Sequence, residues 1–133
     1  MAKHYELFYC LENSIRRLVQ ETLEATHGDA WWDQCSPDDV KKNVTDNIQS
    51  DLDSGFTLRS EEEIDYTTFG ELGVLVRKNW QDFDTLFASQ KAFSKIMTSL
   101  NTLRGPIAHC SPLAEDEVAR LRLTVRDWFR LMG

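Results

Sequence analysis

The spacing of apolar residues most constrains this chain, because it follows the helical repeat along most of its length. In the first stretch, large side chains recur at steps of three and four: Tyr5, Phe8, Leu11, Ile15, Leu18, Val19 and Leu23. Such steps place side chains on one face of an α-helix, which has about 3.6 residues per turn. The pattern predicts a long first helix that ends near His27 and Gly28.

Three further segments repeat the pattern, each with its own start signal. Ser36-Pro37 predicts the N-cap and first residue of a second helix, which Ser54-Gly55 ends. Thr68 and Glu71 have the spacing of a capping box for a third helix, and Ser89 is the N-cap expected for a fourth. The apolar stripes are, in order, Val40, Val44, Ile48 and Leu52; Leu72, Leu75, Val76, Trp80 and Phe83; and Phe93, Ile96, Met97, Leu100 and Leu103.

Two Xaa-Pro pairs define the C-terminal part of the chain. Gly105-Pro106 predicts that the fourth helix ends at Arg104, because glycine suits a left-handed cap and proline resists continuation. Ser111-Pro112 predicts the start of a last helix. That helix is expected to turn Val118, Leu121, Val125, Trp128 and Met132 towards the core. No strand-like alternation is present, and the Trp31–Asp33 stretch is expected to be a loop, so the sequence predicts an all-α bundle.

Length and charge restrict the class of protein. The chain has 133 residues, which suits one domain, and its 41% apolar and 28% charged residues are typical of a globular protein. The net charge of −7 argues against a general nucleic-acid coat protein. The first 70 residues carry 15 acidic and 6 basic side chains, and the remainder carries 7 acidic and 9 basic ones. An anionic ligand would approach the second half, unless this half is simply a solvated surface of mixed charge.

Cysteine usage and hydropathy indicate the compartment. Cys10, Cys35 and Cys110 are odd in number and far apart, which fits a reducing compartment better than a disulfide framework. Residues 1–4 lead directly into an amphipathic segment, and no apolar run approaches the roughly 20 residues of a membrane span. We therefore expect a cytoplasmic protein with no membrane partner. The sequence holds no compact set of metal ligands, so neither a metal nor another cofactor is expected.

Arg104 and His109 are the residues best suited to chemistry. Histidine exchanges protons near neutral pH, and arginine stays charged with a planar fork of donors that fits a phosphate. An unbroken helix would place the two residues about 140° apart, so the predicted break at Gly105-Pro106 would let them converge. The alternative is that Arg104 caps a helix C-terminus and His109 is an ordinary loop residue.

Four segments carry a resemblance to a known family: Leu11-Glu12-Asn13-Ser14-Ile15-Arg16-Arg17-Leu18, Phe69-Gly70-Glu71-Leu72, Asn79-Trp80 and Leu103-Arg104-Gly105-Pro106-Ile107-Ala108-His109. Together they resemble the HEPN superfamily, and especially the accessory HEPN modules of RNA-processing and defence proteins, toxins among them. The resemblance implies one HEPN-like domain over residues 1–133, built as a compact bundle of four to five helices. It also implies a homodimer in which the R-x-x-x-x-H segments of both subunits meet in a cleft.

The resemblance also implies an activity. Arg104 and His109 match the catalytic pair of metal-independent endoribonucleases, which need the 2′-hydroxyl of RNA and so would not cut DNA. His109 would move a proton and Arg104 would stabilise the charged phosphorane. Active members usually have a polar residue where this chain has Gly105, which favours an alternative: a non-catalytic HEPN module for dimerisation and for RNA, nucleotide or protein binding. A protein partner or an attached domain is a further expectation.

The supporting residues each have two interpretations. Glu12, Asn13 and Arg16 share a helix face, either as a plain i,i+4 ion pair or as a buried polar brace behind the catalytic loop. A stripe of arginines is expected on the last helix, either to guide RNA or as a solvated edge: Arg122, Arg126 and Arg130. Trp31 and Trp32 either pack into the core or stack on bases or a partner.

Overall fold

The computed structural model describes residues 2–55, 57–58, 60–108 and 113–132. The helices in this part of the chain are α1 (Ala2–His27), α2 (Trp31–Cys35), α3 (Asp38–Asp53), α4 (Phe69–Lys78), α5 (Gln90–Ala108) and α6 (Glu115–Leu131). Short 3₁₀ turns cover Gly28–Ala30, Glu63–Tyr66 and Trp80–Asp82. These ranges include no strand, so the predicted all-α class is confirmed. None of the described helices is long and apolar enough to cross a membrane.

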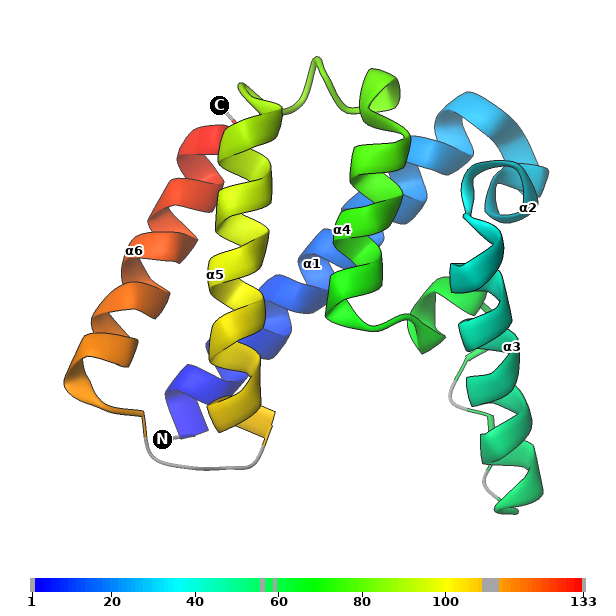
Figure 1. Ribbon diagram of the computed structural model, residues 1–133, viewed down its shortest axis with the longest axis horizontal. Helices are drawn as coiled ribbons and strands as arrows, with labels where there is room; N and C mark the ends of the chain where they lie inside the picture. Colours follow the sequence, from blue (N-terminus) through cyan, green and yellow to red (C-terminus); the bar gives the residue numbers. More distant parts are fainter. Residues whose placement is uncertain (1, 56, 59, 109–112, 133) are drawn as a thin grey trace.

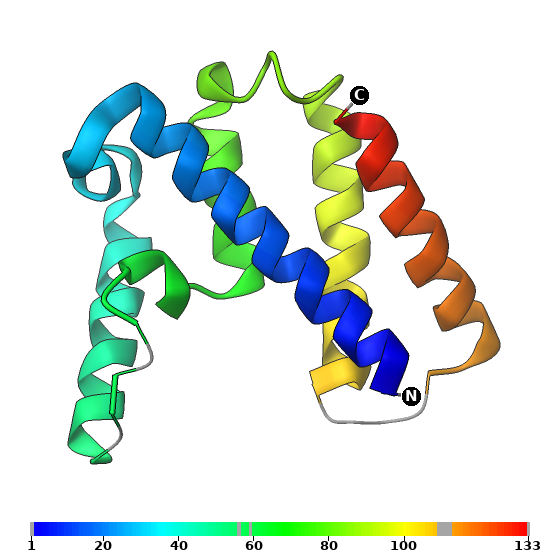
Figure 2. The same ribbon diagram turned by 180° about the vertical axis from the view of Figure 1, so that it is seen from behind.

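The helices pack around a long diagonal element. α1 crosses the pair formed by α4 and α5, lying behind them in Figure 1 and in front of them in Figure 2. α5 packs against α4 and also against α6, whereas α3 lies at the far edge. In both views the N-terminal half of α1 runs beside the C-terminal end of α5. This crossing brings residues near the start of the chain close to residues near 104.

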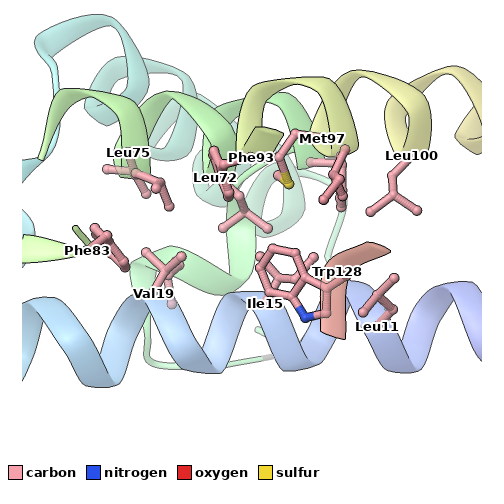
Figure 3. Close-up of a cluster of buried hydrophobic side chains, with 14 of the residues drawn as sticks. Leu11, Ile15, Val19, Leu72, Leu75, Phe83, Phe93, Met97, Leu100 and Trp128 are labelled. Atoms are coloured by element: carbon pink, nitrogen blue, oxygen red, sulfur yellow. The ribbon is translucent and has the colours of Figure 1, made fainter. Parts of the chain in front are cut away.

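The core fills the space where α1 faces α4 and α5 (Figure 3). Completely buried side chains come from each of these helices: Ile15 and Leu23 from α1, Leu72, Leu75 and Val76 from α4, and Phe93 and Leu100 from α5. An aromatic cluster closes one end, with the rings of Phe87 and Phe93 5.1 Å apart and that of Trp128 5.3 Å from Phe87. Burying one large apolar side chain contributes about 1.5–3 kcal/mol, so the predicted helical stripes drive the fold.

Several predicted helix ends are confirmed in detail. The Thr68 hydroxyl accepts from the Glu71 backbone N–H at 3.2 Å, and the Glu71 carboxylate accepts from the Thr68 N–H at 2.8 Å. This reciprocal pair satisfies two donors at the start of α4. α1 ends at His27, and Gly28 follows with a φ of +75°, a conformation that glycine adopts without strain.

The predicted end of the fourth helix at Arg104 is wrong. α5 continues through Gly105 and Pro106 to Ala108, and Gly105 does not adopt the left-handed conformation of a cap. Leu103 and Ile107 lie one turn apart, and each is only 3% exposed. Burial of Ile107 on the core face favours one more helical turn. The free energy of this burial offsets the loss of the backbone hydrogen bond that a proline cannot donate.

The expected loop at Trp31–Asp33 is also wrong, because these residues begin the short helix α2. Trp31 and Trp32 are 5% and 8% exposed, with their rings 5.7 Å apart in an edge-on arrangement. Burial of two indoles fixes the backbone of a segment whose sequence shows no helical repeat. The packing interpretation of the tryptophan pair is therefore confirmed.

Other boundaries shift by a few residues. α3 begins at Asp38 with Pro37 as its N-cap, one residue later than predicted. α4 ends at Lys78, so the predicted third helix does not reach Trp80 and Phe83. α6 begins at Glu115, whereas Ser111-Pro112, the predicted start, lies outside the described residues. At the end of α6 the predicted core residue Met132 is 39% exposed, and Leu131 is buried in its place.

The helical state of Gly105 can be tested by substitution. Gly105→Ala should raise the free energy of unfolding by about 0.5–1 kcal/mol, because alanine is the better helix former and an added Cβ meets nothing within 4 Å. Urea unfolding would measure the change. The matched control is Gly28→Ala, equally unobstructed but at positive φ, which should destabilise by about 1 kcal/mol or more. Destabilisation by Gly105→Ala would contradict the continuous helix.

Candidate functional site

A buried ion pair on α1 forms the base of the site. Glu12 and Arg16 lie one helical turn apart and are 5% and 7% exposed. Arg16 Nη2 donates to Glu12 Oε2 at 3.2 Å and to the Thr67 carbonyl at 3.3 Å, while Nη1 donates to Asn13 Oδ1 at 3.1 Å. Buried charges need this many partners, because each loses its hydration. Glu12 and Arg16 thus form a buried i,i+4 ion pair with the exposed Asn13 at its edge, whereas His109 of the loop that they were expected to support lies outside the described residues.

Arg104 on α5 approaches the other oxygen of the same carboxylate. Its Nε lies 3.6 Å from Glu12 Oε1, within ion-pair range but too long for a hydrogen bond. The Arg104 side chain is 40% exposed. Within the described part of the chain, its two terminal nitrogens make no hydrogen bond and no other ion pair. Glu12 therefore holds the guanidinium at one edge and leaves its fork of donors available to an anion.

These residues border a groove of about 400 Å³. Its lining consists of Tyr9, Glu12, Asn13, Arg16, Ser60, Asp65, Thr67 and Arg104. The Asp65 carboxylate forms an ion pair with Arg17 and accepts a hydrogen bond of 2.5 Å from the Ser60 hydroxyl. Both carboxylates that line the groove thus form ion pairs with arginines of the protein, Glu12 with Arg16 and Asp65 with Arg17. Of the described residues that line it, Arg104 is the cation left to attract a ligand.

The tyrosine at the edge of the groove responds to these charges. Hydrogen bonding to Tyr5 is the largest cause that raises the pKa of Tyr9, and burial raises it further. The Glu12 carboxylate also raises the pKa of Tyr9, whereas the Arg104 guanidinium lowers it. The Tyr9 hydroxyl is therefore within electrostatic reach of both charged groups.

Of the residues Arg104 and His109, only Arg104 lies in the described part of the chain. Gly105 is exposed and helical beside Arg104, and His109 lies outside the described residues. The break that was expected to bring the pair together at Gly105-Pro106 is absent, because α5 runs on to Ala108.

The arginine stripe on α6 is separate from the groove. All three members are exposed: Arg122, Arg126 and Arg130. The buried residues of α6 occupy the opposite face of the helix: Leu121, Thr124, Trp128 and Leu131. None of the three arginines lines the groove at Arg104. The stripe is therefore an exposed face of α6 outside the groove.

Four residues of the groove were missed from the sequence. Tyr9 stands three residues before Glu12, so helical spacing alone places it on the same face, and this signal was present. Ser60, Asp65 and Thr67 come from the segment between α3 and α4 and from its 3₁₀ turn. Nothing in their local sequence indicates that the segment folds back over α1. Among the described residues, no three His, Cys, Asp or Glu side chains gather closely enough to hold a metal ion.

Comparison with known proteins gives one match. A family model described as Swt1-like HEPN matches residues 6–133, a span that contains every residue of the groove. The match confirms the resemblance drawn from the sequence motifs. Neither the curated proteins nor the solved structures that were compared gave a match.

The buried pair should matter for stability far more than an exposed pair of the same spacing. Glu12→Ala leaves the Arg16 guanidinium buried without its counter-ion, which should cost about 3 kcal/mol. Asp46→Ala is the matched control, because Lys42 and Asp46 form an i,i+4 pair whose side chains are 77% and 61% exposed. The control should change stability by less than about 0.5 kcal/mol. Equal effects in urea unfolding would contradict the assignment of Glu12 as a buried brace.

Proposed function

This chain belongs to the Swt1-like HEPN family, and on that premise we propose that it is a metal-independent endoribonuclease in which Arg104 and His109 act on RNA. The observation that carries the proposal is the state of Arg104. Its guanidinium is anchored at one edge by the buried Glu12 carboxylate and presents unused donors to a groove. A phosphate oxygen is the natural acceptor for such a fork.

The reaction that suits these residues is attack of a ribose 2′-oxygen on the adjacent phosphorus. The attack forms the new P–O bond, the bond to the 5′-oxygen breaks, and the products carry a 2′,3′-cyclic phosphate and a 5′-hydroxyl. Negative charge increases on the phosphoryl oxygens in the transition state. Arg104 stabilises this charge, and because its position is set before substrate binds, little reorganisation is needed.

His109 supplies the proton transfers. A neutral imidazole removes the proton from the 2′-hydroxyl, and a protonated imidazole gives one to the leaving 5′-oxygen. In a homodimer with a shared cleft, the two copies of His109 divide these roles. The rate should then be highest near neutral pH, where one imidazole is neutral while the other is charged. The stripe of Arg122, Arg126 and Arg130 would attract RNA at longer range.

An apolar groove between α1 and α6 supports the homodimer. It measures about 620 Å³, and Leu7, Phe129 and Met132 are among the side chains that line it. Phe129 is 65% exposed, Met132 39% and Leu7 37%. In a two-fold symmetric dimer each chain would cover this groove on its partner, so the apolar surface of both copies would be removed from water.

The alternative function is a HEPN module that binds without cleaving. One observation favours it: Gly105 lies on the helix directly after Arg104, is exposed, and contributes no polar group to the site. In that case the groove would bind RNA or a nucleotide and the products of cleavage would not form.

The proposal is tested by cleavage of single-stranded RNA in excess EDTA. The wild-type protein should cleave, and His109→Ala and Arg104→Ala should each lower the rate by about 100-fold or more. Lys95→Ala is the control for Arg104, since Lys95 is an exposed cation on the same helix and does not line the groove. It should keep the wild-type rate.

The same samples should be examined by sedimentation at the assay concentration. The expected mass is about twice that of the 15.4 kDa chain. A monomer that cleaves RNA would contradict the shared cleft. Cleavage that requires added divalent metal would contradict the mechanism, and binding with no cleavage would establish the alternative function.

A further inference from the structure

Two tyrosines at the start of α1 have no part in the chemistry described above. Tyr9 is half-buried and lines the groove at Arg104, and Tyr5 lies one helical turn earlier with 39% of its surface exposed. Their ring centroids are 4.6 Å apart and the planes are inclined by 38°. The two rings therefore pack against each other, and the ring at the groove is next to a more exposed one.

Tyr9 and the Arg104 guanidinium border the same groove. Tyr9 and Arg104 both line the groove, and the Arg104 charge acts on the Tyr9 hydroxyl. Tyr9 stands one turn before Asn13 and three residues before Glu12, which is the residue that anchors Arg104. The helix that holds the guanidinium in place therefore also fixes the ring beside it.

The groove matches the size and chemistry of one nucleotide. Its volume of about 400 Å³ lies within the usual range for small-molecule sites. Its lining includes a cation without a hydrogen-bond partner among the described residues, Arg104, and one aromatic side chain, Tyr9. Ser60 and Thr67 add polar residues to the lining. A nucleotide joins a flat base to a phosphate, so it can use the aromatic side chain and the cation together.

We propose that Tyr5 and Tyr9 form a base-stacking platform, which holds an unpaired base of single-stranded RNA while its phosphate lies against Arg104. This inference rests on the proposed function, because it names how that substrate is held. Every base has a π face, so the platform should accept different bases with little sequence preference. Paired bases are not available for such stacking, so single strands should bind better than duplexes.

The platform makes a specific kinetic prediction. Stacking is the same in the ground state and in the transition state, so its loss should raise KM and leave kcat unchanged. Replacing a stacking aromatic residue by alanine typically weakens binding of nucleic acid by roughly tenfold or more. Tyr9→Leu should therefore raise KM for a single-stranded oligoribonucleotide about tenfold. Tyr9→Phe keeps the ring and should stay within about twofold of the wild type.

Binding should be measured beside cleavage, with a fluorescent 2′-O-methyl oligonucleotide that cannot react. Fluorescence anisotropy should show the same order: wild type and Tyr9→Phe bind alike, and Tyr9→Leu and Tyr5→Leu bind more weakly. Thermal melts of each variant should remain close to the wild type, because Tyr5 is exposed and Tyr9 is only half-buried.

Each contrary result has its own meaning. If the wild type cleaves RNA and Tyr9→Leu keeps its KM, the platform is wrong and the proposed function stands. If Tyr9→Phe is as weak as Tyr9→Leu, the hydroxyl and not the ring is recognised, which overturns stacking. A Tyr9→Leu variant that melts early and loses kcat in proportion would show a structural role only. If the wild type neither binds nor cleaves RNA, the proposed function fails and this inference fails with it.

Discussion

The buried Glu12 carboxylate is the interaction on which the site depends. A charge that is 5% exposed must be compensated, and here two guanidinium groups each approach one of its two oxygens. Arg16 takes the hydrogen bond and also reaches the Thr67 carbonyl, which ties α1 to the segment before α4. Arg104 takes the weaker contact and keeps its terminal donors free. The Glu12–Arg16 pair therefore joins three parts of the chain, and its carboxylate orients the cation that would meet a phosphate.

Much of the fold follows from the sequence, because its helices are specified locally. Steps of three and four, the Thr68/Glu71 capping box and the glycine after His27 each act within a few residues. The failures arise where burial at long range overrides such signals. Trp31 and Trp32 become helical because both indoles are buried, and α5 passes Gly105-Pro106 because Ile107 packs in the core.

Two signals identify part of the site from the sequence: helical spacing on α1, and the family resemblance that singles out Arg104. The spacing of Glu12, Asn13 and Arg16 identifies one face of α1, and the same rule would have added Tyr9. Arg104 meets this face because α1 crosses α5, and no pattern in the sequence specifies that crossing (Figure 2). Ser60, Asp65 and Thr67 belong to a segment without helical repeat, so their return to α1 depends on tertiary packing alone.

The central claim is that the ribose 2′-oxygen, and not water, attacks a phosphate held by Arg104. Mass spectrometry of the fragments from an oligoribonucleotide that carries one 2′-deoxynucleotide tests this most directly. The account predicts 2′,3′-cyclic phosphate and 5′-hydroxyl ends at every cleaved position, and no cleavage on the 3′ side of the deoxynucleotide. Cleavage at that position, or fragments with 5′-phosphate and 3′-hydroxyl ends, would contradict it.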